Sequence, residues 1–508
     1  MIGLTNHELP ITNYNFQQHM TKTSTKWLLL LLGLAFLLLQ LPFIKADPDV
    51  EISWSRGANT DEGLHSGQIR NYIHQGNFDI TESDNFIKTP LFGAYLYFPL
   101  LWFGSSLSVA RWAMVFPFFA MLFWVAWRNN YFRNFLFVLI PIALFEYSTF
   151  NFAHFSLAEM PSNYFILSSV LLLAHSISKN QIWKYAFLIA LFISIAFLLK
   201  IQFLYIIFLP PILFVIYFLK RKKGDEVSWK VLLYANIFLV VMGILYLLLW
   251  YLPNRDFFHY VMVDQTTNRF AKLPDLYNHV RAFHHIILLG KYLAPFTIAF
   301  YFLFPIGIFL SFKKSHPTFK KIFLGLSVWW LLECHKLGMT YLPTRYLLGF
   351  IFSMSAINAL VIFELLRLCL ENKKYKKWIF IPALVFGVLF IFNIYNYKNA
   401  YDRRTYSIRQ INQYLSQFEF DERPIIGAWA PSLTWKTNAR TYPVWGKYFN
   451  DQEVLTQQKP AIIISEVDEN DSNQAYLNQG LQIDQHADSI KYFQIHHIKL
   501  KLLWMKDL

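Results

Sequence analysis

Charged residues are scarce in this chain of 508 residues, and apolar residues take their place. Only 15% of the residues are Asp, Glu, Lys or Arg, whereas 55% are hydrophobic and 19% are aromatic. A soluble chain of this length would form two or three domains with about a quarter of its residues charged. The composition therefore excludes an ordinary soluble protein and predicts a membrane protein with several transmembrane helices.

Cysteine is nearly absent, with Cys334 and Cys369 as the two representatives. Both lie within or beside apolar segments, so neither a disulfide framework nor a cysteine-based metal site is expected. Internal repeats and linkers rich in Gly, Ser or Pro are missing too. The lack of repeats argues against a transporter built from two related halves.

Negative charge is the rarer sign, and the formal net charge is +14. In a soluble protein this excess would suggest nucleic acid as a partner. Here, however, the Lys and Arg residues form short clusters between apolar runs, as they do in the cytoplasmic loops of membrane proteins. We therefore expect no nucleic-acid partner and assign the clusters to the cytoplasmic side.

The apolar runs predict about eleven crossings. The first is expected to be retained as a signal anchor, because no convincing cleavage site follows it. Residues 91–103 are too few for a crossing of about 20 residues, so this run is expected to be re-entrant or interfacial. With that choice every lysine-rich cluster faces the cytoplasm. The predicted crossings are 27–44, 109–127, 135–150, 162–176, 184–199, 203–219, 231–252, 292–312, 322–334, 345–366 and 378–395.

We expect a mainly α fold in three parts. A cytoplasmic tail (1–26) precedes a transmembrane helical domain (27–398) with long external loops at 45–108 and 253–290. In the first loop, Leu64–Gln75 is predicted as a surface helix. The last part (399–508) is polar and mixed, and it predicts a small external α/β domain with a helix at 407–418 and strands at 424–429, 460–465 and 493–503.

Ionisable side chains gather in the segments that this topology places outside. A carboxylate close to several cations suits a reaction that deprotonates a hydroxyl or amine while an anionic leaving group is stabilised. Taken singly, each residue has an ordinary alternative, as a solvated acid or as a lysine that reaches the head groups. We expect Asp61 to be the centre of the site, among Glu62, His65, Lys88, His154, Glu159, Lys200, Arg269, Arg281, His284, His285 and Arg345.

Several short motifs follow one another in a distinctive order. They are Asp61-Glu62-Gly63, Ile69-Arg70-Asn71, Lys88-Thr89-Pro90-Leu91, Leu101-Trp102-Phe103-Gly104 with Arg111, Ala158-Glu159-Met160, Leu199-Lys200 and Thr344-Arg345-Tyr346. This order resembles the membrane glycosyltransferases of the protein O-mannosyltransferase and aminoarabinose transferase superfamily, over about residues 27–400. Thr89, Glu159 and Ile201-Gln202 depart from the family pattern, which leaves the donor open.

The resemblance implies a GT-C fold and inverting transfer of a hexose or pentose from a polyprenyl-phosphate carrier. The acceptor, a lipid, a glycan or a protein, would lie on the periplasmic side of a bacterial inner membrane. In this reading Asp61 is the general base, and Glu159 orients the acceptor or shares that task. Glu62 either contributes to catalysis or caps and tethers the loop helix. The phosphate would be held by Lys88, Lys200 and Arg345, and the candidates for acceptor binding or for structural roles are His65, Arg70 and Tyr346.

Other interpretations stay open. The chain can be a transporter or flippase of envelope lipids or glycans, or a non-catalytic scaffold. No cofactor is expected: Asp61 and His65, one helical turn apart, and His284-His285 are candidate metal ligands, but nothing has zinc-motif spacing. The aromatic segments 427–431 and 442–445 either stack on an acceptor sugar or pack inside the small domain.

Overall fold

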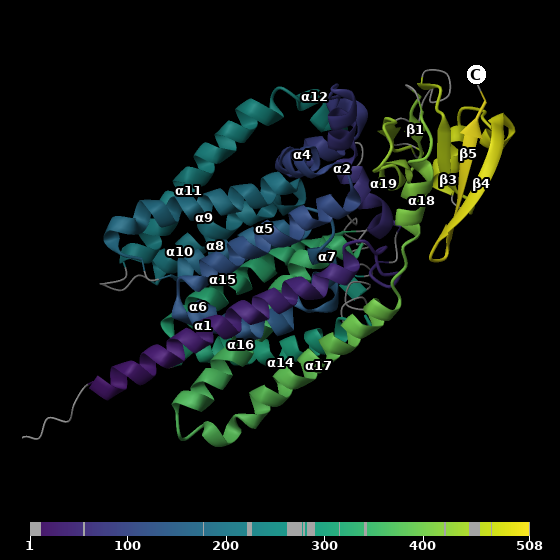
Figure 1. The fold of residues 1–508 in the computed structure, drawn as a ribbon. Helices are drawn as coiled ribbons and strands as arrows, with labels where there is room; N and C mark the ends of the chain where they lie inside the picture. Colours follow the sequence, from purple (N-terminus) through teal and green to yellow (C-terminus); the bar gives the residue numbers. More distant parts are fainter. Residues whose placement is uncertain are drawn as a thin grey trace, which may run out of the picture.

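The computed structural model describes residues 12–506, apart from 54–55, 176, 221–225, 262–276, 278–279, 282–289, 314, 340–342, 421–422, 445, 447–457 and 469. Most of the described chain is helical. The helices run roughly parallel in one bundle, and a small sheet lies at one end of it (Figure 1). The longer helices are α1 (Thr12–Gln40), α2 (Gly57–Gln75), α4 (Pro90–Phe103), α5 (Leu107–Trp127), α6 (Asn130–Leu139), α7 (Tyr147–Ala153), α8 (Glu159–Ala174), α9 (Ile182–Leu199), α10 (Leu209–Leu219), α11 (Glu226–Tyr246), α14 (Ala294–Phe312), α15 (Pro317–Glu333), α16 (Thr344–Glu371), α17 (Phe380–Asp402) and α18 (Ser407–Leu415).

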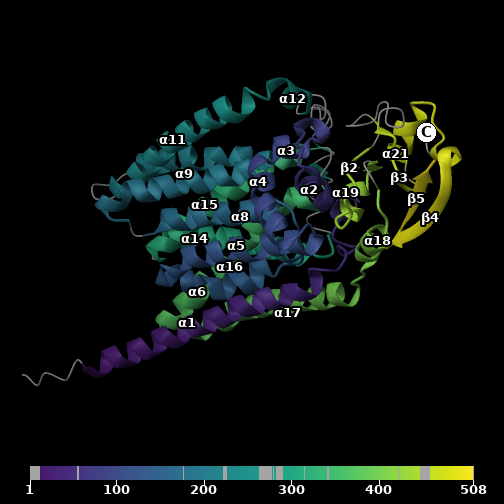
Figure 2. The same ribbon diagram turned by 45° about the horizontal axis from the view of Figure 1, so that its top comes forward.

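Short helical turns connect these helices. They include η1 (Leu41–Phe43), η2 (Ile80–Glu82), α3 (Asn85–Lys88), η3 (Ile140–Leu144), η5 (Ile201–Phe208), η6 (Leu247–Tyr251), α12 (Arg255–His259), η10 (Cys334–Gly338) and η11 (Lys376–Trp378). α1 and α11 lie on opposite flanks of the bundle (Figure 2). The polar residues 12–26, expected to form a tail, continue the first transmembrane helix in the N-terminal direction.

The outward faces of the bundle are apolar. On α11, for example, Val240 is 62% exposed, and Leu249 in the following turn is 73% exposed. Soluble proteins rarely expose contiguous apolar surface of this extent, whereas a lipid bilayer favours it. The chain is therefore a multi-pass membrane protein.

Each of the eleven predicted crossings coincides with a helix. Among the described residues, eight helices are long and apolar enough to span a membrane. A ninth span arises if residues 130–144 and α7, which meet at an angle of 94°, count as one. The two remaining segments, α8 and α15, are helices of 16 and 17 residues. α4 has 14 residues, fewer than a crossing requires. The number of crossings therefore stays a prediction.

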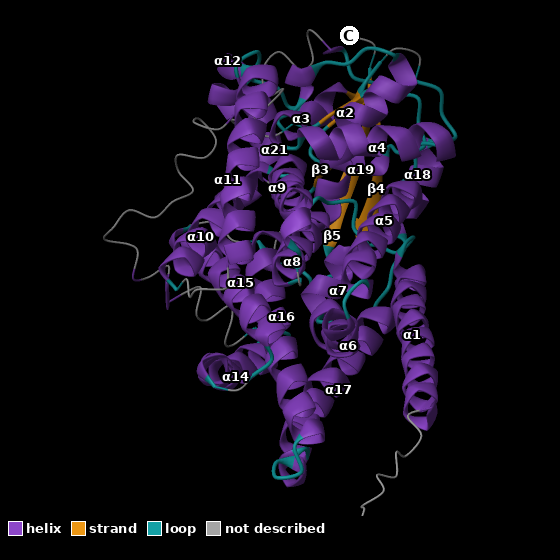
Figure 3. Ribbon diagram, turned by 90° about the vertical axis from the view of Figure 1, so that its left-hand side faces the viewer, coloured by secondary structure: helices purple, strands orange, loops and turns teal. Residues whose placement is uncertain are grey.

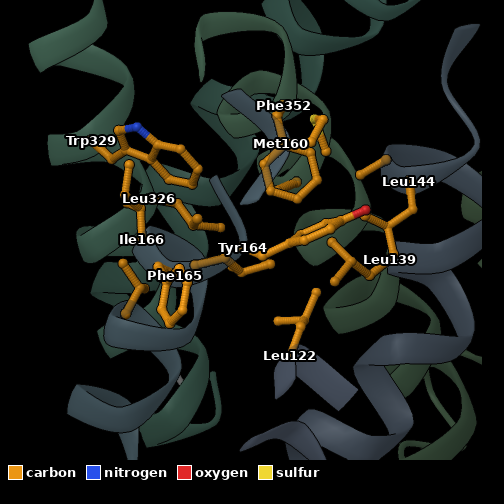
Figure 4. Close-up of a cluster of buried hydrophobic side chains, with 14 of the residues drawn as sticks. Leu122, Leu139, Leu144, Met160, Tyr164, Phe165, Ile166, Leu326, Trp329 and Phe352 are labelled. Carbon is orange, nitrogen blue, oxygen red and sulfur yellow. The ribbon is translucent and has the colours of Figure 1, made fainter. Parts of the chain in front are cut away.

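The core of the bundle is centred on α8, all of whose residues are buried. In Figure 4 the ring of Tyr164 on α8 points toward Leu139 and Leu144, and Phe352 of α16 lies beside it. α16, the longest of the central helices, is also mostly buried. Because α8 and α16 are packed in the core, the first turns of both helices have fixed positions. These turns carry the predicted site residues Glu159 and Arg345.

The strands of the described residues lie in the C-terminal part, whereas the rest of the described chain is mostly helical (Figure 3). The sheet has the order β2-β1-β3-β5-β4, with parallel pairing of β1 to β2 and β3, and antiparallel pairing of β5 to β3 and β4. The strands are β1 (Ile425–Ile426), β2 (Thr441–Tyr442), β3 (Ile462–Glu466), β4 (Ala487–Ile495) and β5 (Ile498–Met505), and α18, α19 (Ala430–Leu433) and α21 (Asn470–Leu477) are the helices of this part. The single strand predicted at 493–503 is wrong, because the chain turns at His496 and the segment is the tip of a hairpin.

Candidate active site around helix α2

Helix α2 lies between the bundle and the C-terminal domain, so the prediction of a surface helix is correct for its structure and wrong for its exposure. Most of its residues from Ala58 to Asn71 are buried. A Cβ on Gly63 would lie 2.3 Å from the backbone nitrogen of Ser432 in α19, so only glycine allows this approach. The hydroxyl of Ser432 also donates a hydrogen bond to the Thr60 carbonyl at 2.8 Å.

Asp61 on α2 forms an ion pair with Arg345, which stands in the first turn of α16. Asp61 is 5% exposed, and 284 residues of sequence separate the partners. The guanidinium of Arg345 also lies 4.9 Å from the ring centroid of Tyr346. Two of the predicted site residues, the expected general base and an expected phosphate ligand, are therefore in direct contact.

A second ion pair joins Glu159, the first residue of α8, to Lys200, which follows α9. Glu159 is fully buried and Lys200 nearly so. The ammonium of Lys200 lies 5.9 Å from the Tyr346 ring centroid, so this pair is next to the Arg345 pair. The arrangement places Glu159 at the same end of the bundle as Asp61, as the charge pattern predicted.

Lys88, at the end of α3, pairs with Asp84. The pKa of His65, which lies on α2 one helical turn after Asp61, indicates that Lys88 is close to this helix. Burial lowers the pKa of His65 well below its ordinary value, and the positive charges of Lys200 and Lys88 lower it further. His65 is therefore neutral near pH 7 and lies close to both lysines, as a hydrogen-bonding group and not as a third cation.

A fourth pair was not predicted. Glu333, at the end of α15, is fully buried, forms an ion pair with Lys336, and accepts hydrogen bonds from Tyr205 and, at 3.3 Å, from Trp329 Nε1. It abuts Gly349, one turn along α16 from Arg345. The signal in the sequence was an acid at the end of an apolar run, which is typical of a functional position in a membrane protein.

Glu62 has a different environment from its neighbour Asp61. Both of its carboxylate oxygens accept hydrogen bonds from Arg111, at 2.9 and 2.6 Å, and one also accepts from the Ser156 amide at 2.6 Å. Arg111 is fully buried and donates further hydrogen bonds to three backbone carbonyls, of Phe43, Ile44 and Ala46. These contacts favour the structural alternative for Glu62, which ties α2 to α5.

Arg70 is also occupied by structural contacts. Its guanidinium is buried and donates to the Thr437 carbonyl at 2.6 Å and the Ala439 carbonyl at 3.0 Å. Asn71 beside it donates to the Thr441 carbonyl at 2.9 Å. The Arg-Asn motif therefore fastens the C-terminal domain to α2.

No group of three or more His, Cys, Asp or Glu side chains within the described ranges has the geometry of a metal site. Of the predicted candidates, Arg269, His284 and His285 lie outside the described residues. In the C-terminal domain, Trp429 is fully buried and donates a hydrogen bond to Glu466 at 2.6 Å. Its ring is packed inside the domain, where a sugar has no access to it.

Comparisons with models of protein families and with curated proteins give no match. Among solved structures, ArnT from Cupriavidus metallidurans is similar in two states, the apo state and bound to undecaprenyl phosphate. In each case the TM-score is 0.62 at 13% sequence identity, over 94% of this chain and 98% of ArnT. The chain has the ArnT fold. The expected resemblance to the aminoarabinose transferases and the GT-C architecture are thereby confirmed at the level of the fold.

A further similarity is to the archaeal oligosaccharyltransferase AglB from Archaeoglobus fulgidus, in complex with an inhibitory peptide and a dolichol-phosphate. Its TM-score is 0.49 at 10% identity, over 96% of this chain and 74% of AglB. Within the ArnT fold of the present chain, α2 and the starts of α8 and α16 carry the paired charges described above. Their roles in a reaction are a matter of chemistry and not of fold similarity.

Proposed function

We propose that this protein is a membrane glycosyltransferase that moves a sugar from a polyprenyl-phosphate carrier to an acceptor, with inversion, at the external end of the bundle. The observation that carries the proposal is the cluster of buried ion pairs around α2, in which Asp61 is paired with Arg345, while His65, one helical turn later, lies near Lys200 and Lys88. The ArnT fold supports the same class of reaction, because the solved ArnT binds undecaprenyl phosphate.

Among the described residues of the cluster, acids and cations are equal in number. Asp61, Glu159, Asp84 and Glu333 are each matched by one cation, respectively Arg345, Lys200, Lys88 and Lys336. A phosphate group can bind only if it takes over some of these cations from their carboxylates. Arg345 is suited to this exchange, because a guanidinium binds phosphate and carboxylate in the same bidentate way.

The exchange prepares the reaction. When the donor phosphate binds Arg345, Asp61 loses its counter-ion and becomes a stronger base. Asp61 then accepts the proton of the acceptor hydroxyl or amine while that group attacks the anomeric carbon from the face opposite the phosphate. The bond between the anomeric carbon and the phosphate oxygen breaks, its electron pair stays on the phosphate, and Lys88, Lys200 and Arg345 stabilise the added charge.

Two measurements on one variant test this mechanism. Asp61→Asn removes the base, so transfer from a panel of polyprenyl-phosphate sugars should fall about 10²- to 10⁴-fold. The same substitution frees Arg345 from its carboxylate, so undecaprenyl phosphate should bind at least as tightly as it does to the wild type. Arg345→Met should show the opposite pattern and lose binding. Glu159→Gln should lower transfer, and Asp484→Asn, an exposed acid of the C-terminal domain, is the matched control.

The outcomes separate the competing readings. Undiminished transfer in Asp61→Asn would remove Asp61 as the base. Transport of a labelled polyprenyl-phosphate lipid across vesicles without any turnover would favour the flippase alternative. Weaker lipid binding by Asp61→Asn would contradict the exchange of Arg345 between carboxylate and phosphate.

A further inference from the structure

A cavity of about 270 Å³ lies between the bundle and the C-terminal domain, apart from the paired charges around α2. On the bundle side it is lined by Lys45, just after the first transmembrane helix, and by residues 106–108 at the start of α5. On the domain side it is lined by Arg409 of α18 and by Trp435 and Lys436. The cavity therefore lies where the C-terminal domain meets the ends of two candidate transmembrane spans, Thr25–Phe43 and Leu107–Trp127.

The cavity is lined by three cations, Lys45, Arg409 and Lys436. None of them has a hydrogen bond or ion pair with any residue in the part of the chain that the structure describes. The one acid of the lining is Asp47, and its two oxygens already accept hydrogen bonds from Thr405 at 2.7 Å and from the amides of Ser407 and Ile408 at 2.7 and 3.0 Å. The three cations outnumber the single carboxylate, so the lining of the cavity has an excess of positive charge.

Two further features favour an anion there. Helix α5 begins in the cavity, and a helix of 21 residues presents its free amides and the positive end of its dipole at that point. Trp435 is 2% exposed, and its indole N–H has no hydrogen-bond acceptor among the described residues. A buried donor of this kind normally has a partner, and an oxyanion in the cavity is one.

The position of the cavity relative to the candidate transmembrane spans indicates which anion is available to it. Because it adjoins the end of one candidate span and the start of another, it lies at a membrane surface, where the phosphates of phospholipids are found. Basic pockets between transmembrane helices bind the head groups of acidic lipids. We propose that this cavity is a binding site for the phosphate of an anionic phospholipid, which joins the C-terminal domain to the bilayer surface. The site is independent of the proposed transfer reaction.

The test uses the full-length, delipidated protein in detergent and a short-chain phosphatidylglycerol, with binding followed by native mass spectrometry. The triple variant K45Q/R409Q/K436Q should bind the lipid at least tenfold more weakly than the wild type. The control K373Q/K374Q/K377Q removes the same charge beyond the far end of α16 and should bind like the wild type. Trp435→Phe keeps an aromatic side chain but removes the N–H together with the five-membered ring, and it should weaken binding a few-fold while the protein still folds.

Three results would overturn the proposal. Equal weakening in both triple variants would mean that only net charge attracts the lipid. Wild-type binding in K45Q/R409Q/K436Q and in Trp435→Phe would mean that the cavity does not hold the head group. Competition by inorganic phosphate at the same concentration as the lipid would assign the site to a free phosphate. If the triple variant fails to fold, Trp435→Phe alone decides between these results.

Discussion

Adjacent carboxylates on α2 differ in what surrounds them. Glu62 accepts from three fixed donors, and its partner Arg111 is itself held by three carbonyls. Asp61 is paired with one guanidinium, which a phosphate group can replace. The donors around Glu62 come from the buried Arg111 and a backbone amide, so they hold its carboxylate in place and leave no oxygen free for an acceptor. The two acids of one motif therefore have separate roles, and the sequence alone left that choice open for Glu62.

We predict that Glu62→Gln has a larger effect on the stability of the folded protein than on the rate of sugar transfer. The substitution leaves Arg111 buried without its counter-ion, and breaking a buried pair in this way costs about 3–5 kcal/mol. Thermal unfolding in detergent measures the loss. Glu371→Gln is the control, because Glu371 pairs with Arg367 but is largely exposed, and a pair of that kind contributes about 0–1 kcal/mol. Unchanged unfolding together with lost transfer in Glu62→Gln would instead make Glu62 a catalytic group.

At the scale of the element, α2 shows why burial could not be predicted. Its sequence is polar and lacks an apolar stripe, which is the pattern of a surface helix. It is buried because its polar side chains and carbonyls bond to residues about 370 positions later, such as Thr437 and Ser432. In the structure, Gly63 and Gly67 lie at this contact. In the sequence, a glycine within a helix indicates only a lower helix propensity.

Two glycines on α2 give a matched pair of variants. Gly63→Ala places a methyl group 2.3 Å from the Ser432 nitrogen, so α19 must move, at a cost of about 1–3 kcal/mol. Gly67→Ala meets only the side chain of Pro431 at 3.4 Å and should be neutral or stabilising, because alanine favours a helix. Hydrogen exchange of residues 430–441 should rise in the first variant and stay unchanged in the second. The same exchange rate in both would contradict the close contact.

The hairpin of β4 and β5 was missed for a different reason. Its turn contains His496 and His497 and lacks the Gly, Asn or Pro that usually marks a hairpin turn. His496 has a positive φ of 52°, and its ring nitrogen Nε2 donates a hydrogen bond to the Pro48 carbonyl at 2.8 Å. A tertiary contact thus accompanies a backbone conformation that no local residue signal indicates.

At the scale of the whole molecule, the charge pattern was the most informative part of the sequence. It assigned Asp61, Glu159, Lys200 and Arg345 to one end of the bundle, and the structure brings them together there. It could not indicate which acid forms an ion pair with which cation, because these partners meet only after the helices have packed. The pair of Glu333 with Lys336 is different, because its partners are three residues apart in the sequence. What the sequence could not indicate is that Glu333 is buried against Gly349 of α16.

The junction between α2 and the C-terminal domain should respond to pH through Glu82. This residue is buried and accepts hydrogen bonds from Arg440 at 2.7 Å and Asn71 at 2.9 Å. Burial raises its pKa from about 4.5 to about 7, although both partners oppose that shift. Between these two values the folded protein retains a proton that the unfolded chain has lost. Stability must therefore fall as the pH rises from about 4.5 to 7 and be independent of Glu82 outside that window.

The expected change across this window is at most on the order of 3 kcal/mol, from a pKa difference of about 2.5. Glu82→Gln keeps the shape and the hydrogen bond to Asn71 but cannot ionise, so its stability should not change through Glu82 between pH 4.5 and 7. Hydrogen exchange of residues 437–442, measured at several pH values on both proteins, tests this directly. The wild type should exchange faster at pH 7.5 than at pH 5 after correction for the intrinsic rate, whereas the variant should not. If the two proteins show the same pH dependence, the protonation of Glu82 does not control how the domain is held on α2.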